Sequence, residues 1–194
     1  MYRPALETLR TLIRTSTSSM TSVPKPLKFL RPHYPALESI YEKWPPSDDK
    51  VSALWSLVSR ISHSFQSLFA DILGVLAMTY SDTRPRETLK YRLLSNSMSK
   101  EPSPPGLWGH EYVRHLAAEL GSEYAIRVES GEDTSELREL AYVCATFLLE
   151  HNAEADAVDL LEELECVDKI TDLLDKNTFA RVCAYMVRLV ASLY

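Results

Sequence analysis

Glycine is scarce in this sequence, with 5 residues among 194. Glycine supplies the left-handed backbone conformations that tight hairpins and phosphate-binding loops require, and an average protein contains about 7% of it. The shortage argues against hairpin-rich β folds and against glycine-rich nucleotide sites. Alternation of apolar and polar residues, which is typical of a half-buried strand, nowhere extends over more than a few residues. We therefore expect no sheet.

Long apolar runs are missing as well. The longest run covers Ile72 to Met78, which is far shorter than the ~18 residues that a membrane span needs. The first residues, Met1 to Glu7, contain no apolar core of a secretory signal peptide. The sequence therefore predicts neither a membrane partner nor secretion.

Cysteine occurs three times, as Cys144, Cys166 and Cys183, without a CxxC spacing. An odd and widely spaced set of this kind is typical of reduced thiols in a protein of the cytosol or nucleus. Cys144 and Cys183 both fall among apolar residues at helical spacing. We expect them to be buried packing residues rather than reactive groups.

Helical periodicity is the feature that the sequence has in abundance. Hydrophobic residues make up 45% of the chain and charged residues 25%, which are ordinary values for a globular protein with a core. Apolar residues recur three and four positions apart. They predict helices over 4–14, 27–30, 35–44, 51–80 (as one helix or two), 86–95 and 108–128, and further helical segments after residues 134, 152, 166 and 177. The fold class that follows is all-α: an α-solenoid-like stack of antiparallel helix pairs, without a sheet and without a strict repeat period.

Polar residues and prolines mark the ends of these helices. Thr134, Asn152 and Asn177 are expected N-caps, because their side chains can accept a hydrogen bond from a backbone N–H in the first helical turn. Residues 15–22 are expected to be a polar linker, and 96–106 a Pro/Ser-rich loop. The sequence ends on an apolar helix without a polar capping repeat, so we expect a fragment of a longer protein.

Charge is distributed unevenly along the chain, whose net charge is −6. Residues 1–43 contain seven Lys/Arg and three Asp/Glu, whereas residues 128–176 contain three Lys/Arg and fifteen Asp/Glu. The acidic half repels nucleic acid and the basic half is too sparse for a phosphate-binding stripe, so we expect no nucleic-acid partner. Segments of opposite charge suit docking to other proteins, although an acidic helix face can equally be a solvated surface.

Two segments are candidate docking surfaces. The first is the basic connector, residues 25–34, where prolines limit any helix to a short piece. Basic and aromatic residues together could also contact nucleic acid, but the proline-rich context favours a packed connector between helices. The second is the set of acidic helix faces between Glu129 and Asp175. The candidate interface residues of the basic connector are Lys25, Lys28, Arg31 and Tyr34.

Catalytic and metal-binding patterns are weak. His110, Glu111 and His115 resemble a zinc-protease motif, but the two histidines of such a motif must be four residues apart to share a helix face. Residues five apart lie about 140° apart around a helix. There is no Gly-x-Ser-x-Gly sequence, and no two carboxylates are expected to converge from separate elements. The sequence thus predicts no catalytic residue, no cofactor and no metal site, with a metal hydrolase at these three residues as the enzymatic alternative.

Several sequence blocks resemble one known family, and they occur in the family's order over nearly the whole chain. The blocks are Ser18-Ser19-Met20-Thr21-Ser22-Val23-Pro24-Lys25-Pro26-Leu27-Lys28-Phe29-Leu30-Arg31-Pro32-His33-Tyr34, Ala70-Asp71-Ile72-Leu73, Val75-Leu76-Ala77-Met78-Thr79, Leu89-Lys90-Tyr91-Arg92-Leu93, Trp108-Gly109-His110-Glu111-Tyr112-Val113-Arg114-His115-Leu116-Ala117 and His151-Asn152-Ala153-Glu154. In these blocks the chain resembles the N-terminal region of the large non-ATPase scaffold subunit in the base of the proteasome regulatory particle, a family with proteasome/cyclosome repeats.

This resemblance implies that residues 1–194 form the N-terminal helical region of a non-catalytic scaffold, which contributes to ubiquitin-dependent protein degradation by protein–protein contacts. It implies the proteasomal ATPase ring and other regulatory-particle subunits as partners, and the cytoplasm and nucleus as the location. In this family, ubiquitin and ubiquitin-like shuttle proteins dock on a toroid of repeats. The sequence does not contain that toroid, so no such site is expected here. The alternative is a helical-repeat adaptor of a different complex.

Residues 51–66 interrupt the resemblance. The family pattern passes directly from the equivalent of Lys50 to that of Ser67, which leaves these sixteen residues as an insertion. A splice-donor consensus can encode the start of the segment, and a polypyrimidine tract ending in CAG can encode its end. We hypothesise a translated, in-frame intron. The rival is a genuine added helix, because apolar residues within the segment keep helical spacing.

Overall fold

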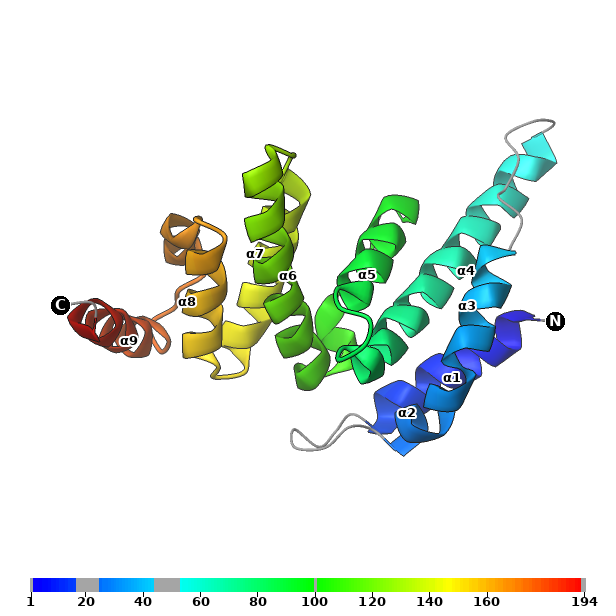
Figure 1. The fold of residues 1–194 in the computed structure, drawn as a ribbon, viewed down its shortest axis with the longest axis horizontal. Helices are drawn as coiled ribbons and strands as arrows, with labels where there is room; N and C mark the ends of the chain where they lie inside the picture. Colours follow the sequence, from blue (N-terminus) through cyan, green and yellow to red (C-terminus); the bar gives the residue numbers. More distant parts are fainter. Residues whose placement is uncertain (1, 17–24, 44–52, 100, 193–194) are drawn as a thin grey trace. The chain divides into compact units, whose positions relative to one another are not determined.

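The computed structural model describes residues 2–16, 25–43, 53–99 and 101–192, and every regular element within these ranges is helical (Figure 1). No strand occurs in this part of the chain, which confirms the all-α fold class. Most of the expected linker 15–22 lies outside the described residues, as do the first two residues of the insertion 51–66. The chain divides into two compact units, Met1–Glu111 (unit 1) and Tyr112–Tyr194 (unit 2).

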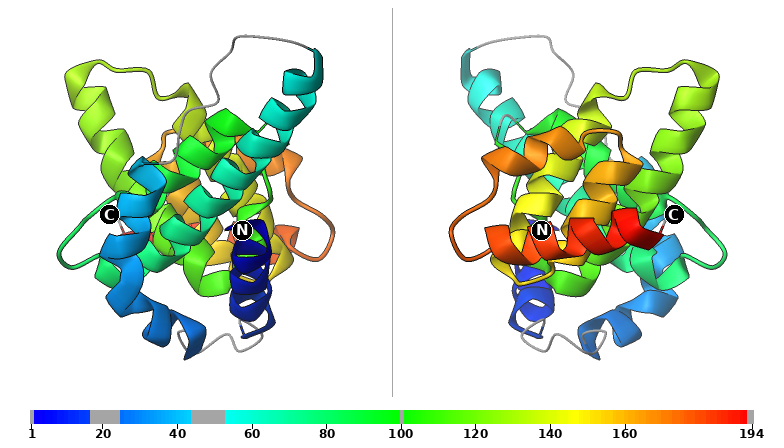
Figure 2. Two further views of the ribbon diagram at one scale, coloured as in Figure 1. Left: turned by 90° about the vertical axis from the view of Figure 1, so that its right-hand side faces the viewer. Right: turned by 90° about the vertical axis from the view of Figure 1, so that its left-hand side faces the viewer.

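Unit 1 is built on an antiparallel pair of helices, α4 (Ala53–Ala77) and α5 (Glu87–Met98), which lie side by side (Figures 1 and 2). α1 (Tyr2–Ser16) and α3 (Tyr34–Glu42) pack against α4. The stretch that periodicity allowed as one helix or two is one α-helix with a 3-10 turn at its end. The other elements of unit 1 are α2 (Lys25–Leu30) and 3-10 helices at Arg31–His33, Met78–Tyr80 and Pro105–Trp108.

The core of unit 1 lies along α4, where every residue from Phe69 to Ala77 is buried. Ile13 of α1, Leu27 of α2 and Leu89 of α5 are also buried, with exposed fractions of 0%, 0% and 2%. Burying a large apolar side chain stabilises a fold by ~1.5–3 kcal/mol relative to leaving it exposed. The apolar run that the sequence showed between Ile72 and Met78 therefore belongs to a helix that is covered on more than one side.

A buried ion pair ties the segment after α5 to this core. Arg92 and Asp71 are 2% and 3% exposed, and the Nη1 and Oδ1 atoms of the pair are 3.3 Å apart. Arg92 Nη2 donates to the backbone carbonyl of Ser103 at 2.6 Å, and the Ser103 hydroxyl donates to Asp71 Oδ2 at 2.7 Å. Two buried charges are tolerated because each has a charged and a polar partner.

The loop expected over 96–106 is shorter than the composition suggested. α5 continues to Met98, and a 3-10 helix begins at Pro105. The hydroxyl oxygens of Ser95 and of Ser67 on α4 are 2.9 Å apart, and both side chains are buried. This contact between α4 and α5 supports the last turn of α5. It could not be predicted from the serine-rich composition of the segment, because its partner is distant in the sequence.

Unit 2 contains most of α6 (His110–Ser130) together with α7 (Ser135–Glu150), α8 (Glu154–Glu163), a 3-10 helix at Val167–Asp172 and α9 (Phe179–Ser192). α7 packs on α8, and α8 packs on α9, as expected for helices joined by short turns. Leucines make up much of the core of unit 2; Leu116, Leu120, Leu137, Leu148 and Leu161 are each 0% exposed. Within the described residues, no helix is both long enough and apolar enough to cross a bilayer.

The cap at the start of α7 differs from the prediction. Thr134 makes no side-chain cap hydrogen bond. The Asp133 carboxylate instead accepts from the backbone N–H of Ser135 at 3.0 Å and from its hydroxyl at 2.5 Å. These hydrogen bonds, that from the Ser135 hydroxyl above all, lower the pKa of Asp133. Thr134 thus occupies the predicted N-cap position, but the expected side-chain hydrogen bond is made by the carboxylate one residue earlier, which suits the positive end of the helix dipole.

The predictions for the next two helices are also wrong. Asn152 has a left-handed φ of 58°, and its side chain accepts from Arg181 Nη2 at 3.0 Å rather than capping α8. Before α9, the Asp175 carboxylate accepts from the backbone N–H groups of Asn177 at 2.8 Å and Thr178 at 2.7 Å. Asp175 therefore closes the turn before α9, and the first hydrogen bond of the helix runs from the N–H of Val182 to the carbonyl of Thr178. The hydrogen bonds from Thr178 and Asn177 lower the pKa of Asp175.

Candidate partner interface

The basic connector consists of α2, the following 3-10 turn and the first residue of α3. Its prolines fit because they stand at the starts of helices, where the missing N–H costs no hydrogen bond: Pro32 lies in the first positions of the 3-10 turn, and the adjoining Pro35 in those of α3. Leu27 and Tyr34 are each 0% exposed, so both ends of the connector are anchored in the core of unit 1.

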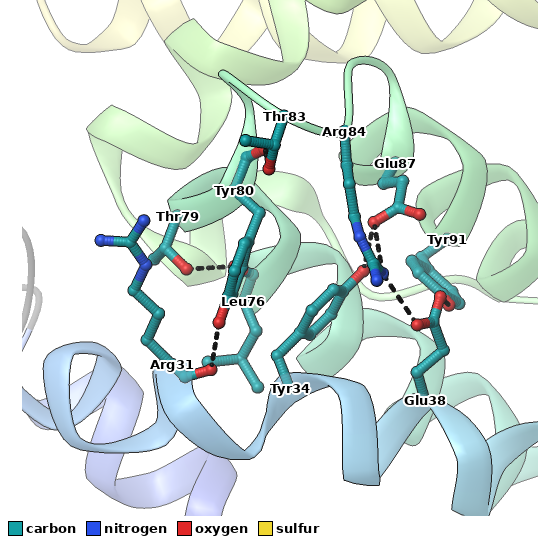
Figure 3. A network of polar contacts seen from close by, with 10 residues as sticks. All are labelled: Arg31, Tyr34, Glu38, Leu76, Thr79, Tyr80, Thr83, Arg84, Glu87 and Tyr91. Atoms are coloured by element: carbon teal, nitrogen blue, oxygen red, sulfur yellow. Dashed lines mark hydrogen bonds and ion pairs between the residues drawn. The ribbon is translucent and has the colours of Figure 1, made fainter.

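Tyr80, at the end of the 3-10 turn after α4, holds the middle of the connector. Its ring stacks on that of Tyr34, with the ring centroids 5.2 Å apart. Its hydroxyl donates to the backbone carbonyl of Arg31 at 2.8 Å, and the Arg31 guanidinium lies over its ring, with Cζ 4.9 Å from the centroid (Figure 3). Tyr80 therefore fixes both the backbone and the side chain of Arg31.

A second group of contacts joins α3 to α5 and to the turn before it. The Tyr34 hydroxyl donates to Glu87 Oε2 at 2.8 Å. Glu38 accepts from Arg84 Nη1 at 2.8 Å and from the Tyr91 hydroxyl at 3.0 Å (Figure 3). We call these five residues together with Tyr80 the aromatic network. Each tyrosine hydroxyl of the network has an acceptor, which for Tyr80 is the backbone carbonyl of Arg31, and each carboxylate has a donor.

The charge states in the aromatic network suit these roles near neutral pH. Burial alone would raise the pKa of Glu38, but the hydrogen bonds from Arg84 and Tyr91 outweigh it and hold the pKa below its ordinary value. Burial and the hydrogen bond to Glu87 raise the pKa of Tyr34, and burial and the hydrogen bond to Glu38 raise that of Tyr91. Glu38 is therefore an ionised acceptor, and both tyrosines keep the protons that they donate.

The sequence-predicted interface residues fall into two groups. Lys25, Lys28 and Arg31 are exposed, so their charges face solvent. Tyr34 is 0% exposed, and its contribution is to hold the connector in place from the inside. Sequence reasoning missed the residues of the aromatic network outside the connector, because the chain separates them from their partners by 46 to 53 residues. Periodicity reports only local relations, so no pattern in the sequence points to these pairs.

The acidic segment between Glu129 and Asp175 uses many of its carboxylates within unit 2. Glu154 pairs with Arg181 at 2.5 Å, and Asp156 pairs with Arg114 at 3.0 Å. Asp159 accepts from the Tyr185 hydroxyl at 2.7 Å. The Asp133 carboxylate accepts hydrogen bonds at the start of α7, and that of Asp175 accepts them in the turn before α9. These contacts support the structural interpretation of the acidic faces rather than a docking surface along their whole length.

The histidines and cysteines are placed as follows. His115 Nε2 lies 3.0 Å from Glu119 Oε1, one turn further along α6. No group of three or more potential metal ligands gathers among the described residues. Cys144 is 0% exposed, as expected, whereas Cys183 is only half-buried. Burial raises the pKa of Cys166, which disfavours the reactive thiolate.

Two small hollows occur on the described surface. One, of about 160 Å³, lies in unit 1 and is lined by Arg10, Arg14, Asp71 and Trp108 among others; the Asp71 carboxylate there is held in the buried pair. The other, of about 170 Å³, lies between α6 and α8 in unit 2. Both are smaller than the ~300–1,000 Å³ of typical small-molecule sites. The extended helical surface is therefore the better candidate for function.

Comparison with known proteins places these features in context. The family model described as RPN1 N-terminal domain matches residues 1–194. The 26S proteasome regulatory subunit rpn-1 of Neurospora crassa is 50% identical over 190 residues, which is 98% of this chain and 19% of that protein. The 26S proteasome regulatory subunit rpn1 of Schizosaccharomyces pombe is 48% identical over 186 residues, which is 96% of this chain and 18% of that protein. The 26S proteasome non-ATPase regulatory subunit 2 homolog B of Arabidopsis thaliana is 44% identical, with the same coverage. The chain spans about a fifth of the length of these curated relatives.

Proposed function

The chain belongs to the RPN1 N-terminal domain family, and on this basis we propose that it acts within a non-catalytic scaffold subunit of the 26S proteasome regulatory particle. The observation that carries the proposal is the 44–50% identity over at least 96% of this chain to relatives named as regulatory subunits of the 26S proteasome. The chain contributes to ubiquitin-dependent protein degradation in the cytoplasm and nucleus by holding partners, and it makes or breaks no covalent bond.

The partner proposed for the basic connector is the proteasomal ATPase ring, with other regulatory-particle subunits around the chain. The exposed charges of Lys25, Lys28 and Arg31 support this role, because a cationic surface attracts and orients an acidic protein surface. The aromatic network supports it as well, since a connector held on both sides loses little entropy on binding. Docking of ubiquitin and shuttle proteins belongs to the parts of the relatives that extend beyond this chain.

Charge reversal in the connector tests this assignment. Lys28→Glu combined with Arg31→Glu, in the tagged protein that carries this chain, is expected to lower the recovery of proteasomal ATPase subunits on the order of tenfold, because like charges then face each other. Lys169→Glu combined with Lys176→Glu makes the same change of charge at two exposed lysines of unit 2 and serves as the matched control.

The outcomes separate the alternatives. Unchanged recovery of the ATPase subunits with the Lys28 and Arg31 variant counts against the connector as the interface. Absence of proteasome subunits even with the unmodified protein would reject the scaffold proposal and favour the adaptor of another complex. Stoichiometric zinc in the purified chain would revive the hydrolase alternative at His110, Glu111 and His115.

A further inference from the structure

Phe29 is the most exposed large apolar side chain in the described part of the protein, with 78% of its surface accessible. The neighbouring Leu27 on the same short helix is 0% exposed. α2 is therefore not a loose segment whose side chains all face water. One side of it is anchored in the core, and that anchoring leaves Phe29 on the outside.

The chain on either side of Phe29 carries charge of one sign. Lys25, Lys28, Arg31 and His33 are exposed, and the sequence contains no Asp or Glu from Thr8 to Leu37. No carboxylate close to it in the chain is therefore available to neutralise these cations. An exposed aromatic ring with cations on both sides of it in the chain is complementary to a surface that presents carboxylates beside an apolar hollow.

The aromatic network keeps this arrangement rigid. Tyr80 contacts the carbonyl and the guanidinium of Arg31 (Figure 3), two residues after Phe29. The burial of Leu27 fixes the backbone two residues before Phe29. A side chain presented from a fixed backbone binds at a lower entropic cost than one on a flexible loop. Large aromatic side chains of this kind are frequent hot spots of interfaces.

We infer that Phe29 is the apolar anchor of the interface formed by the basic connector, and that its partner is an acidic protein segment whose apolar hollow receives the ring. The inference rests on the scaffold function proposed above and goes beyond it by naming the anchoring residue and the chemistry of the partner. The carboxylates of the partner face Lys25, Lys28 and Arg31 around the buried ring. A lipid or nucleic-acid surface is the competing occupant for such a patch.

Substitution at Phe29 tests the anchor in the assembled particle. Phe29→Ser in the tagged protein is expected to lower the recovery of its regulatory-particle partners by roughly tenfold or more, as removal of a hot spot does, whereas Phe29→Trp restores most of it. Phe179→Ser is the matched control, because Phe179 is 58% exposed but lies on α9 in unit 2. The thermal unfolding midpoint of the Phe29→Ser protein should equal that of the unmodified protein, since the ring is outside the core.

A photo-crosslinking amino acid at position 29 tests the chemistry of the partner. Mass spectrometry of the crosslinked product is expected to identify a peptide rich in Asp and Glu. A basic or neutral peptide, a lipid or a nucleic acid would overturn the inference. If the unmodified protein recovers its partners and Phe29→Ser does so equally well, the anchor is rejected and the scaffold function stands. If the unmodified protein recovers no proteasome subunit, both proposals fall.

Discussion

Arg92 is a charged side chain in the core of unit 1, where a charge without a partner would be expensive. It is held by Asp71 and by the backbone carbonyl of Ser103, and Asp71 also accepts from the Ser103 hydroxyl. The exposed pair of Glu7 and Arg10 has the same charges, but its side chains are 38% and 40% accessible. We therefore expect loss of one partner to lower the stability of the chain much more for the buried pair than for the exposed pair.

Substitution of one carboxylate from each pair tests the difference in stability between the buried and the exposed ion pair. Asp71→Ala leaves the Arg92 guanidinium without its counter-charge and is expected to destabilise the chain by ~3–5 kcal/mol. Glu7→Ala, which removes one partner of the exposed pair, should cost less than ~1 kcal/mol. Urea unfolding followed by circular dichroism gives both values. Equal costs for the two variants would contradict the structural role of the buried pair.

The stability that Glu38 contributes is expected to depend on pH. Because hydrogen bonds from Arg84 and Tyr91 keep its pKa in the folded chain below the ordinary value of 4.5, its contribution to stability is present above that pH. The contribution is lost as the pH falls through the pKa of the folded state. The unfolding midpoint of Glu38→Gln should therefore lie below that of the unmodified chain at pH 7, and the gap should narrow on acidification below about pH 4.5.

The same acid titration of Glu42→Gln is the control for Glu38, because Glu42 is an exposed carboxylate on the same helix. Its midpoint should differ little from that of the unmodified chain at every pH. A gap for Glu38→Gln that stays constant between pH 7 and acid would show that Glu38 does not act as an ionised acceptor.

At the scale of helices, the sequence was informative about where each helix lies and less so about its ends. The segments 86–95 and 108–128 correspond to α5 and α6, because apolar spacing is a local property of the chain. The caps were missed because several polar residues stand before each helix, and the choice among them depends on side-chain geometry. Before α9, for example, Asp175 accepts from the N–H groups of Asn177 and Thr178 in the preceding turn, and the helix begins two residues after Asn177.

The start of α9 offers a direct comparison of these two residues. Asp175→Ala removes the acceptor for the N–H groups of Asn177 and Thr178 and is expected to speed hydrogen exchange of these two amides, in the turn that leads into α9 (Phe179–Ser192). Asn177→Ala keeps the backbone donor and should leave exchange unchanged. Hydrogen exchange followed by mass spectrometry distinguishes the variants, and a faster rate with Asn177→Ala alone would restore the cap that the sequence suggested.

α4 bears on the proposed insertion over residues 51–66. Residues 53–66 form the first part of this helix, and the buried stretch that faces its neighbours includes Ser67 and 69–77. The stretch that follows the insertion, where the family pattern resumes, therefore contributes to the core of unit 1. We propose that the segment is a translated intron, and amplification of the message across codons 50–67 should give a product shorter by 48 nucleotides. If every message contains the segment, it is a genuine extension of α4.

For the whole molecule, the exposure of the cations of the connector was easier to predict from sequence than the contacts that hold the connector in place. Exposed cations in the connector followed from charge and proline spacing, and Lys25, Lys28 and Arg31 are indeed at the surface. The burial of Tyr34 could not be predicted from the sequence. It depends on contacts with Tyr80 and Glu87, which follow α4 in the chain. The exposure of Phe29 had a local signal, since it lies off the stripe formed by Leu27 and Leu30.

The uneven charge of the chain predicts a dependence on salt. Association through the connector should weaken as the ionic strength rises above about 0.1 M, where the screening length is ~10 Å. Replacing Lys25, Lys28 and Arg31 with Gln should lower recovery of the complex at low salt and flatten its dependence on salt. Pull-down across a salt series measures both. A slope that is the same with and without the three cations would locate the electrostatic attraction elsewhere on the chain.

The division into two units has a practical consequence for spectroscopy. Trp108, which is 3% exposed, belongs to unit 1, and all the cysteines belong to unit 2. Indole fluorescence therefore responds to the unfolding of unit 1, whereas the rate of reaction with a thiol reagent follows the opening of unit 2 around Cys144 and Cys166, which are 0% and 3% exposed. A single denaturant series on the unlabelled chain thus yields two natural signals, one from each unit.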